Sequence, residues 1–321
     1  MSPVFVVSGA LNLDFFYEVP SLQGLQTLNL QMVPGGEVAL SREAFEELRQ
    51  RLRQKGREVA LCGGGSAANT AFALARFGFE VAFSGACGED EAGEKALAEL
   101  AAAGVELSGV LREGTTGQAL IVLDAHRDRF IAVCPGSCEK ALEDFKPQVR
   151  GDWLHLSSLI SEEGFAFHTR LVRDFTGNIS LDPGEIYAGR GPGLKSLLKR
   201  TRTLFLTQVE LEKLGLLPEE LFALGVEEIF LKRGAQGAAW ISPRERIFLP
   251  AARALKVVDN TGAGDFFDAG VLAGLARGLP PPAALQLGLK VAAQSLRDYG
   301  RRGCPLPEEL KTLFQEVSSS A

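Results

Sequence analysis

An acidic residue follows a run of small residues at Asn260-Thr261-Gly262-Ala263-Gly264-Asp265, directly before an apolar helical pattern. Small residues at the start of a helix leave backbone N–H groups uncovered, and the helix dipole adds partial positive charge where they converge. Such a turn can bind a phosphate group without a lysine. The carboxylate of Asp265 could then accept the proton of an attacking hydroxyl. The segment therefore predicts phosphoryl transfer, although taken alone it is more simply a capped, Gly-rich helix start.

Two further polar segments precede this one in the chain. Gly63-Gly64-Gly65 leads into a helical pattern that carries Asn69, whose amide can both donate to and accept from a hydroxyl. Asn12 and Asp14 follow the first expected strand, at a spacing that places both side chains on one side of an extended chain. Each segment alone is more often a tight turn. Polar groups at the carboxyl end of a strand also suit recognition of a hydroxyl-bearing ligand.

Short aliphatic or β-branched segments alternate with longer amphipathic segments along most of the chain. Nearly continuous apolar strands separated by helices are typical of an α/β fold, in which helices cover both faces of a mostly parallel sheet. The expected strands centre on residues 4–7, 81–83, 153–156, 179–181, 204–206 and 229–231. The expected helices span about 67–77, 91–103, 163–175, 193–199, 209–214 and 218–224.

Residues 11–40 and 115–135 break this alternation and have the pattern of β-hairpins. Because hairpins cannot easily join a parallel sheet in sequence, we expect them to form a small β-rich lid. Between them, residues 41–58 show apolar side chains at helical spacing behind Ser41 as a candidate N-cap, and we expect a solvated helix there. No repeat or long linker divides the chain, so a single domain over residues 1–321 is expected.

Composition excludes several classes of function. Among the 321 residues, 46% are hydrophobic, which is enough for a large core. The 34 basic and 40 acidic residues give a net charge of −6, which disfavours a nucleic-acid binder. No apolar run is long enough to span a membrane and the chain begins without a basic signal-peptide segment, so we expect a cytoplasmic protein without membrane partners. The five scattered cysteines and three histidines form no metal-ligand pattern.

Together, these motifs resemble those of the ribokinase family of sugar and nucleoside kinases, also called the PfkB family. The resemblance rests on Gly64, Gly65 and Asn69 in a Gly-Gly-x-x-x-Asn element, and on the Asn-Thr-Gly-Ala-Gly-Asp element that ends at Asp265. The order of the two elements and their separation of roughly 190 residues match the family. The resemblance implies a ribokinase-like three-layer α/β/α domain with a small β lid. It also implies an ATP-dependent kinase that phosphorylates a primary hydroxyl of a sugar or nucleoside.

The family's functional positions can be carried over one by one. Asp265 looks like the catalytic base, and the anion hole would be formed by Gly262, Ala263 and Gly264. The acceptor hydroxyls would be contacted by Asn12, Asp14, Gly64, Gly65 and Asn69. ATP would lie along Lys232, Gly234, Ala235, Gly237 and Thr261. Magnesium would be supported by Glu210, and a monovalent cation such as K⁺ by Asp259.

This sequence departs from the family pattern at two places. Family members commonly carry Asn-x-x-Glu before the ATP loop, whereas this chain has Thr207-Gln208-Val209-Glu210, so an altered metal environment is expected. Ser157-Ser158 stands where ribokinases proper tend to place a carboxylate on the sugar. The second departure disfavours a ribose-specific enzyme, and the acceptor is left open between sugars and nucleosides.

Two other functions remain open at this point. Thr207 is compatible with a protein that keeps the fold and binds sugar or nucleotide but no longer transfers phosphate. The βα alternation alone would also permit an NAD-dependent oxidoreductase, although the first strand leads to Gly9-Ala10-Leu11-Asn12 and not to a dinucleotide-binding turn.

An exposed edge strand of the lid could pair with the lid of a second copy of the chain, so we expect a homodimer through the lid.

Overall fold

A nine-stranded sheet forms the centre of the computed structural model, which describes residues 3–23 and 32–319. The strand order is β14-β13-β12-β11-β10-β9-β1-β5-β6. Neighbouring strands are parallel from β12 to β6, while β13 and β14 are antiparallel at the other edge. The strands are β1 (Val4–Ser8), β5 (Glu80–Cys87), β6 (Glu106–Arg112), β9 (Trp153–Ser157), β10 (Asn178–Asp182), β11 (Thr203–Thr207), β12 (Glu228–Lys232), β13 (Ala238–Ile241) and β14 (Arg246–Leu249).

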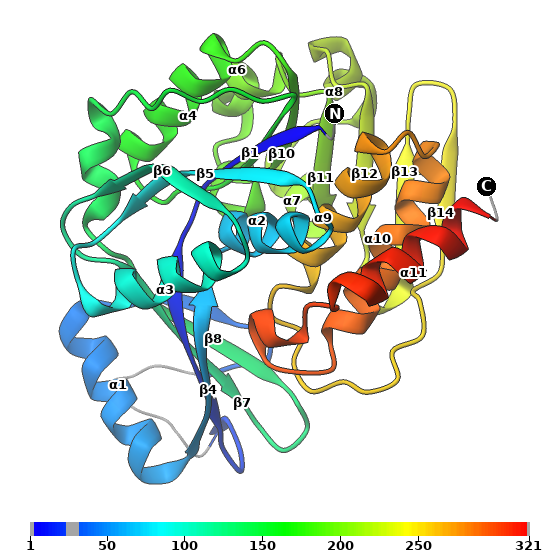
Figure 1. Ribbon diagram of the computed structural model, residues 1–321. Coiled ribbons are helices and arrows are strands. Elements are labelled where there is room, and N and C mark those ends of the chain that lie inside the picture. The colour runs from blue at the N-terminus through cyan, green and yellow to red at the C-terminus, as the bar shows by residue number, and fades with distance from the viewer. Residues whose placement is uncertain (1–2, 24–31, 320–321) are drawn as a thin grey trace.

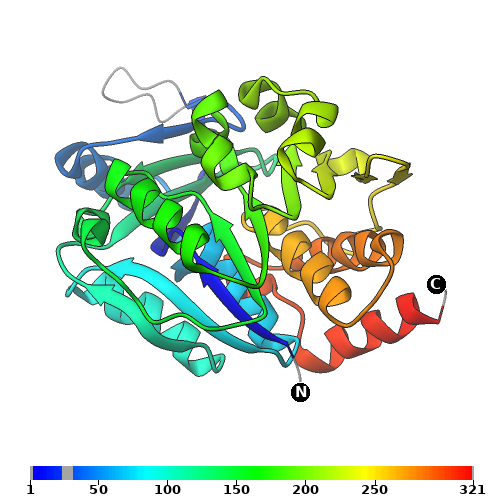
Figure 2. The same cartoon turned by 90° about the horizontal axis from the view of Figure 1, so that it is seen from above.

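Helices cover both faces of this sheet because successive strand residues are apolar. In β1, Phe5 and Val7 belong to the core on one face, while Val6 belongs to the core on the other. The first face is covered by α2 (Ser66–Arg76), α3 (Glu91–Ala102), α9 (Ala263–Ala276), α10 (Pro281–Ser295) and α11 (Pro307–Ser318). The second is covered by α4 (Glu162–Asp174), α5 (Gly184–Ala188), α6 (Lys195–Leu198), α7 (Gln208–Leu214) and α8 (Pro218–Leu224). Figure 2 shows helices on both sides, and the predicted three-layer α/β fold is confirmed.

A second, smaller sheet lies below the large one in Figure 1 and has the order β3-β8-β7-β2-β4. Its strands are β2 (Asn12–Glu18), β3 (Glu37–Ala39), β4 (Arg57–Gly64), β7 (Gly117–Leu123) and β8 (Arg129–Cys134). β7 and β8 form the hairpin predicted for residues 115–135. The hairpin predicted for residues 11–40 is wrong, because β2 pairs with β4 and β7 whereas β3 pairs with β8. Part of that segment, residues 24–31, lies outside the described residues.

Helix α1 (Arg42–Lys55) packs on the small sheet. Ser41 is its N-cap, as predicted, and accepts a hydrogen bond from Ala44 N at 3.3 Å. The expectation of a solvated helix is wrong, since Phe45, Leu48 and Leu52 are fully buried against the sheet. The opposite face of the small sheet carries a second cluster of buried apolar residues.

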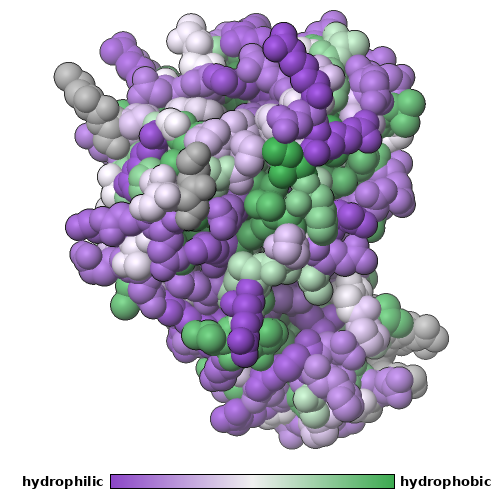
Figure 3. Space-filling view, turned by 90° about the vertical axis from the view of Figure 1, so that its right-hand side faces the viewer, coloured by the Kyte–Doolittle hydropathy of each residue, from purple (hydrophilic) through white to green (hydrophobic). Residues whose placement is uncertain are grey.

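The carboxyl ends of the parallel strands lie together at one edge of the large sheet. Asp182, Thr207 and Lys232 end three adjacent strands, and Thr207 is directly opposite Lys232 in the register. This edge faces the start of α9 and the small sheet (Figure 1). Figure 3 shows that the molecule narrows toward the small sheet. Because the carboxyl ends of β10, β11 and β12 are aligned, the side chains that end these strands lie within reach of one ligand.

Several elements were not identified from the sequence, namely β4, β6, β13, β14, α5, α10 and α11. Four short 3₁₀ helices complete the fold over the described residues: η2 (Cys138–Glu143), η3 (Gly191–Leu194), η4 (Gly234–Gln236) and η5 (Gly300–Gly303). All five cysteines are buried and none forms a disulfide. No helix of the described part of the chain is long and apolar enough to cross a membrane.

Candidate active site

The two glycine-containing motifs meet at a hydrogen bond between Asn69 and Asp265. Asn69 lies in the first half of α2 and Asp265 in the first turn of α9, and these two helices pack side by side. Asn69 Nδ2 donates to Asp265 Oδ2 at 2.8 Å, across 196 positions of sequence. Both side chains are buried. The structure therefore brings the predicted base and a predicted acceptor-binding residue into one site.

The turn before α9 depends on the glycine at position 262. Gly262 has φ +79°, a conformation that side-chain-bearing residues rarely adopt, and a Cβ there would lie 3.1 Å from Asn69 Nδ2. Ala263 N donates to Asn260 O at 3.3 Å, so that amide is already engaged within the turn. The turn opens into the N-terminus of a helix of 14 residues, where the dipole favours an anion.

Asp259 holds this turn in place. Its Oδ1 accepts hydrogen bonds from Thr261 N at 3.0 Å and from Thr261 Oγ1 at 2.8 Å. Its Oδ2 accepts from Gly300 N at 3.0 Å, which ties the turn to η5. Asp259 is buried, and its contacts in the structure are those of a loop-fixing residue. Among the described residues, no group of three or more His, Cys, Asp or Glu side chains could hold a metal ion.

The acceptor-binding residues predicted from the first half of the chain gather where β2 pairs with β4. Asp14 packs directly over Gly64, since a Cβ on Gly64 would overlap the Asp14 carboxylate. Gly65 has φ +90° at the N-cap of α2, where a Cβ would overlap Ala10 O. Asn12 lies opposite Gly64 in the same strand pair. The missing side chain on Gly64 thus leaves room for the Asp14 carboxylate, and the missing side chain on Gly65 leaves room for the backbone at Ala10.

Burial raises the pKa of both carboxyl groups in this part of the site. The pKa of Asp265 is raised to about 7, and the hydrogen bond from Asn69 acts in the opposite direction. The pKa of Asp14 is also raised to about 7 by burial, which the positive charge of Arg301 partly counters. Asp14 Oδ1 is buried with no hydrogen-bond partner among the described residues. A base whose pKa lies near neutrality suits proton abstraction at physiological pH.

Lys232 ends β12 within a buried cluster of acids. Its Nζ donates to Asp182 Oδ2 at 2.7 Å and lies 3.3 Å from Asp268 Oδ2. Burial alone would lower the pKa of Lys232. The negative charges of Asp182 and Asp268 have the larger effect and hold this pKa above its usual value. Burial raises the pKa of Asp268 well above its usual range, whereas Lys232 keeps that of Asp182 low despite burial. The cluster thus places one lysine cation between two buried carboxyl groups whose pKa values are shifted in opposite directions.

The segment after Lys232 forms a short loop beside this cluster. Gly234 has φ +54° in open space, and Gly237 has φ +104° where a Cβ would overlap Leu249 O of β14. Ala235 is exposed on η4. Lys232 itself touches the start of α9, because its Nζ lies 3.6 Å from the place where a Cβ of Gly264 would be. The loop predicted to contact ATP therefore adjoins the predicted anion hole.

The departure at Thr207 has a local structural role. Thr207 is the N-cap of α7, and its Oγ1 accepts a hydrogen bond from Glu210 N at 3.2 Å. Glu210 Oε2 accepts from Thr207 N at 2.7 Å, which completes a capping box. Burial raises the pKa of Glu210, and the nearby negative charge of Asp182 adds to this effect. Threonine thus replaces the family's asparagine with a residue that fixes Glu210.

Three side chains of this site were missed in the sequence analysis. Asp182 and Asp268 carried a signal, since Asp182 ends a predicted strand and Asp268 follows Asp265 by three positions on one helix. Arg301 carried none. It is 3% exposed, and it donates from Nε to Asn69 Oδ1 at 2.8 Å and from Nη2 to Gly64 O at 2.9 Å.

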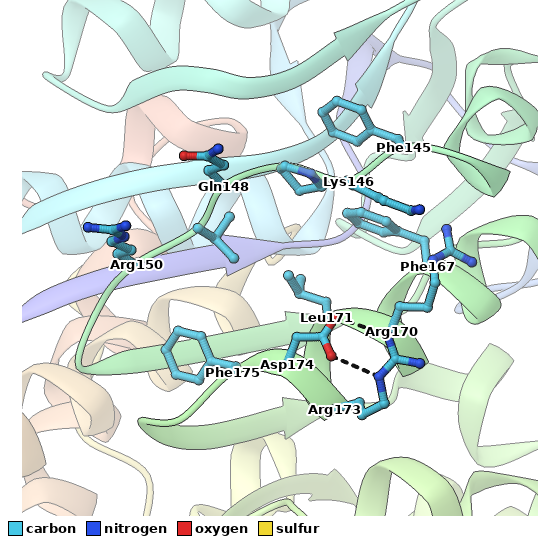
Figure 4. A pocket seen from close by; sticks show the side chains of 12 residues that line it. Phe145, Lys146, Gln148, Arg150, Phe167, Arg170, Leu171, Arg173, Asp174 and Phe175 are labelled. Carbon is cyan, nitrogen blue, oxygen red and sulfur yellow. Dashed lines mark hydrogen bonds and ion pairs between the residues drawn. The ribbon is translucent and has the colours of Figure 1, made fainter.

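A cavity of about 480 Å³ lies away from all these residues, between α4 and residues 145–150 (Figure 4). Its lining includes Phe145, Lys146, Arg150, Phe167, Arg170, Arg173 and Phe175. Arg173 is already bonded to Asp174 at 2.8 Å. The cavity adjoins the amino ends of β9 and β10, which is the sheet edge opposite the motifs. It is therefore separate from the candidate active site.

Comparisons with known proteins agree on one family. A family model described as "pfkB family carbohydrate kinase" matches residues 36–309. An uncharacterized sugar kinase of Archaeoglobus fulgidus is 35% identical over 246 residues, which cover 72% of this chain and 98% of that protein. A ribokinase of Bacillus subtilis is 29% identical over 265 residues, which cover 78% of this chain and 87% of that protein.

Solved structures with the same fold include enzymes with different substrates. The adenosine kinase of Sinorhizobium meliloti superimposes with a TM-score of 0.81 at 20% identity, covering 100% of this chain and 99% of the other. The nucleoside kinase of Methanocaldococcus jannaschii gives a TM-score of 0.77 at 18% identity, covering 98% of both chains. At such low identity these likenesses establish the fold and leave the substrate open.

Proposed function

The chain belongs to the pfkB family of carbohydrate kinases, and from this premise we propose how its residues transfer phosphate from ATP to a primary hydroxyl of a sugar or nucleoside. Family members are phosphotransferases with an alcohol acceptor, and the chain is an ATP-dependent kinase of this kind. The contact between Asn69 and Asp265 carries the proposal, because it joins the acceptor motif to the phosphate motif.

Asp265 acts as the general base. Its carboxylate accepts the proton of the acceptor hydroxyl while the hydroxyl oxygen bonds to the γ-phosphorus of ATP. The bond from that phosphorus to the β,γ-bridging oxygen breaks, and ADP leaves with the electron pair. Oδ2 of Asp265 accepts the hydrogen bond from Asn69, and we assign the proton to the other carboxylate oxygen, Oδ1.

The phosphate charge is stabilised by the start of α9 and by Lys232. The turn at Gly262 and the helix dipole face the migrating phosphoryl group, and the Lys232 ammonium lies beside Gly264. Mg²⁺ bound to the ATP phosphates would neutralise further charge. Glu210 supplies the kind of oxygen ligand that this ion prefers and would contact it through water. A K⁺ ion near Asp259 stays a prediction.

The acceptor binds between the small sheet and the carboxyl edge of the large sheet. Asp14 offers an unpartnered buried oxygen, and Asn12 lies on the same side of β2. The small sheet acts as a lid, and Arg129 of β8 already reaches across to Thr261, with Nη1 3.5 Å from Oγ1. Closure of such a lid excludes water, which would otherwise compete as the phosphate acceptor.

The two alternative functions are less well supported. The relatives and solved structures named above are kinases, which does not favour an NAD-dependent oxidoreductase. A silent binding protein was suggested by Thr207, but this residue caps α7 and orients Glu210. The distinction is experimental, because a binding protein would take up nucleotide without forming ADP.

The substitution Asp265→Asn tests the proposed base. It should lower kcat by ~10²–10⁴ and leave ATP affinity nearly unchanged, because the neutral amide keeps the shape of the side chain but cannot accept the proton. Acceptors are first identified by ADP release over a panel of sugars, sugar phosphates and nucleosides. Asp144→Asn, an exposed substitution at the end of η2, is the control. Turnover near that of the unsubstituted enzyme in Asp265→Asn would contradict the assignment.

A homodimer through the lid is a further part of the proposal. β3 and β4 are the edge strands of the small sheet, and strand edges can pair with a second copy. Sedimentation velocity across micromolar concentrations should detect a dimer. A monomer at every concentration would remove this part of the proposal and leave the catalytic assignment intact.

A further inference from the structure

Arg301 connects the C-terminal part of the chain to both halves of the candidate active site. Its buried guanidinium bonds Asn69 Oδ1 and Gly64 O, which lie 232 and 237 positions away in sequence. Its Nη1 lies 3.6 Å from Glu99 Oε2 and has no hydrogen-bond partner among the described residues. Burying a charged side chain costs free energy unless all its polar groups are paired. Because Nη1 of Arg301 is not hydrogen-bonded within the described part of the chain, stability alone does not explain why an arginine lies here, and we ask what it does in the site.

The bond from Arg301 fixes the orientation of the Asn69 amide. An arginine side chain has only donors, so it can bond only the oxygen of that amide. With Oδ1 held toward Arg301, Nδ2 must face Asp265, and it donates to Asp265 Oδ2 at 2.8 Å. Hydrogen bonds in such a chain strengthen one another. The positive charge of Arg301 thus reaches the base through a single oriented amide.

The neighbouring glycines provide the space for this arrangement. A Cβ on Gly63 would overlap Arg301 Nη1, and a Cβ on Gly64 would overlap the Asp14 carboxylate. Arg301 lies close enough to oppose the effect of burial on the pKa of Asp14. One guanidinium therefore supports the base on one side and an acceptor-binding carboxyl group on the other.

We propose that Arg301 is a positioning residue of the phosphotransfer site, which orients Asn69 so that Asp265 stays hydrogen-bonded and ready to accept a proton, and which holds the Gly64 backbone under Asp14. This inference rests on the proposed kinase function. Arg301 itself contacts neither the phosphate nor the acceptor hydroxyl.

Arg301→Gln and Arg301→Lys test the inference, with Arg302→Gln as the matched control. Arg302 is the exposed neighbour of Arg301 in the same 3₁₀ helix, and it plays no part in the proposed mechanism. Arg301→Gln should lower kcat by roughly 10–100-fold and change the KM for ATP little. Removing the nearby positive charge raises the pKa of Asp265, so the acidic limb of the kcat profile should move up by about one pH unit. Arg302→Gln should change neither quantity.

Arg301→Lys is the more conservative variant, which keeps the inference testable if Arg301→Gln does not fold. Lysine keeps the charge but cannot bond Asn69 and Gly64 together in the planar geometry of a guanidinium, so a partial loss of kcat is expected. Circular dichroism and thermal melting establish that each variant is folded. A folded Arg301→Gln with the unchanged pH profile, or Arg301→Lys with unchanged kcat, would overturn the inference.

A double-mutant cycle with Asn69→Ala tests whether Arg301 acts through Asn69. If it does, the double variant should lose little more kcat than Asn69→Ala alone. Fully additive losses would overturn the inference.

The activity of Asp265→Asn shows whether a failure concerns the proposed base or only the positioning role of Arg301. If that variant keeps full turnover, the proposed base and this inference both fail. If it is inactive while the Arg301 variants are unaffected, only this inference fails.

Discussion

Asp14 and Asp265 show how single buried residues couple catalysis to stability. Each has its pKa raised by burial from 3.8 to about 7, so each binds a proton more tightly in the folded protein than in the unfolded chain. The stability that this provides is complete below pH 4 and is lost as the pH rises through about 7. As the proposed base, Asp265 must be ionised to accept a proton, so activity should rise as the pH passes through about 7, where the last of this stability is lost.

Asp14→Asn should separate these effects. The amide cannot ionise, so the variant should be more stable than the unsubstituted protein at pH 8, by about 2–4 kcal/mol, and nearly equal to it at pH 4. Urea unfolding at both pH values measures the difference, and Asp144→Asn is the exposed control. A stability difference that does not change with pH would contradict the raised pKa. Acceptor binding should weaken in the same variant.

Lys232 is the residue whose loss should affect both stability and nucleotide binding. Lys232→Met leaves Asp182 and Asp268 buried without their cation, which should lower the free energy of unfolding by about 3–5 kcal/mol. ATP affinity, measured by calorimetry, should fall as well. Lys290→Met is the control, because Lys290 bonds Glu316 at the surface and such pairs contribute at most about 1 kcal/mol. ATP affinity within twofold of the original would exclude a phosphate contact for Lys232.

At the scale of elements, helix α9 offers a comparison between its two ends. Gly262 precedes it with φ +79°, and Gly278 follows it with φ +82°. A Cβ on Gly262 would crowd Asn69, whereas a Cβ on Gly278 would meet nothing within 4 Å. The φ angle is thus nearly the same at both glycines, while their surroundings differ.

Gly262→Ala and Gly278→Ala should therefore differ in activity more than in stability. Each alanine should cost about 1 kcal/mol of unfolding free energy for its positive φ. Only Gly262→Ala should also lower kcat, by at least ~10-fold, because it displaces Asn69 and the anion-binding turn. Steady-state kinetics and thermal melts of both variants check this. Equal activity in the two variants would show that the turn tolerates a side chain.

The sequence predicts an element well only where the residues of that element form a recognisable local pattern. Buried strands such as β9 and β10, and the start of α9, have local signals of continuous apolar residues or small residues before a helix. β4 begins with Arg57 and Glu58 and ends in glycines, so its strand character comes from pairing with β2. Arg301 was missed for a similar reason, since no local pattern relates it to Gly64 or Asn69.

At the scale of the whole molecule, Tyr299 links the small sheet to the C-terminal segment. Its hydroxyl donates to Glu18 Oε1 at 2.5 Å, and this bond, with those from Arg57 and Arg127, lowers the pKa of Glu18 to about 2. Arg57 and Arg127 bond Glu18 from within the small sheet. Of these three contacts, that of Tyr299 is the one that joins the small sheet to the C-terminal segment.

Tyr299→Phe should loosen the small sheet, whereas Arg57→Gln should not. We expect a rise of several-fold in the KM for the acceptor, with kcat nearly kept, because lid closure is weakened but the base stays in place. Faster hydrogen exchange in β2 and β7 of the Tyr299→Phe variant would show the loosening directly. The same exchange rates in both variants would mean that Tyr299 does not restrain the lid.

The reach of Arg301 across the fold has a consequence for biosynthesis. The ribosome has translated Asn69 long before it reaches Arg301, the residue that orients its amide, which lies 232 positions later. A nascent chain that stops before residue 301 would lack the guanidinium and would leave the Asn69 amide free to turn. Products that terminate before residue 301 should therefore transfer little phosphate.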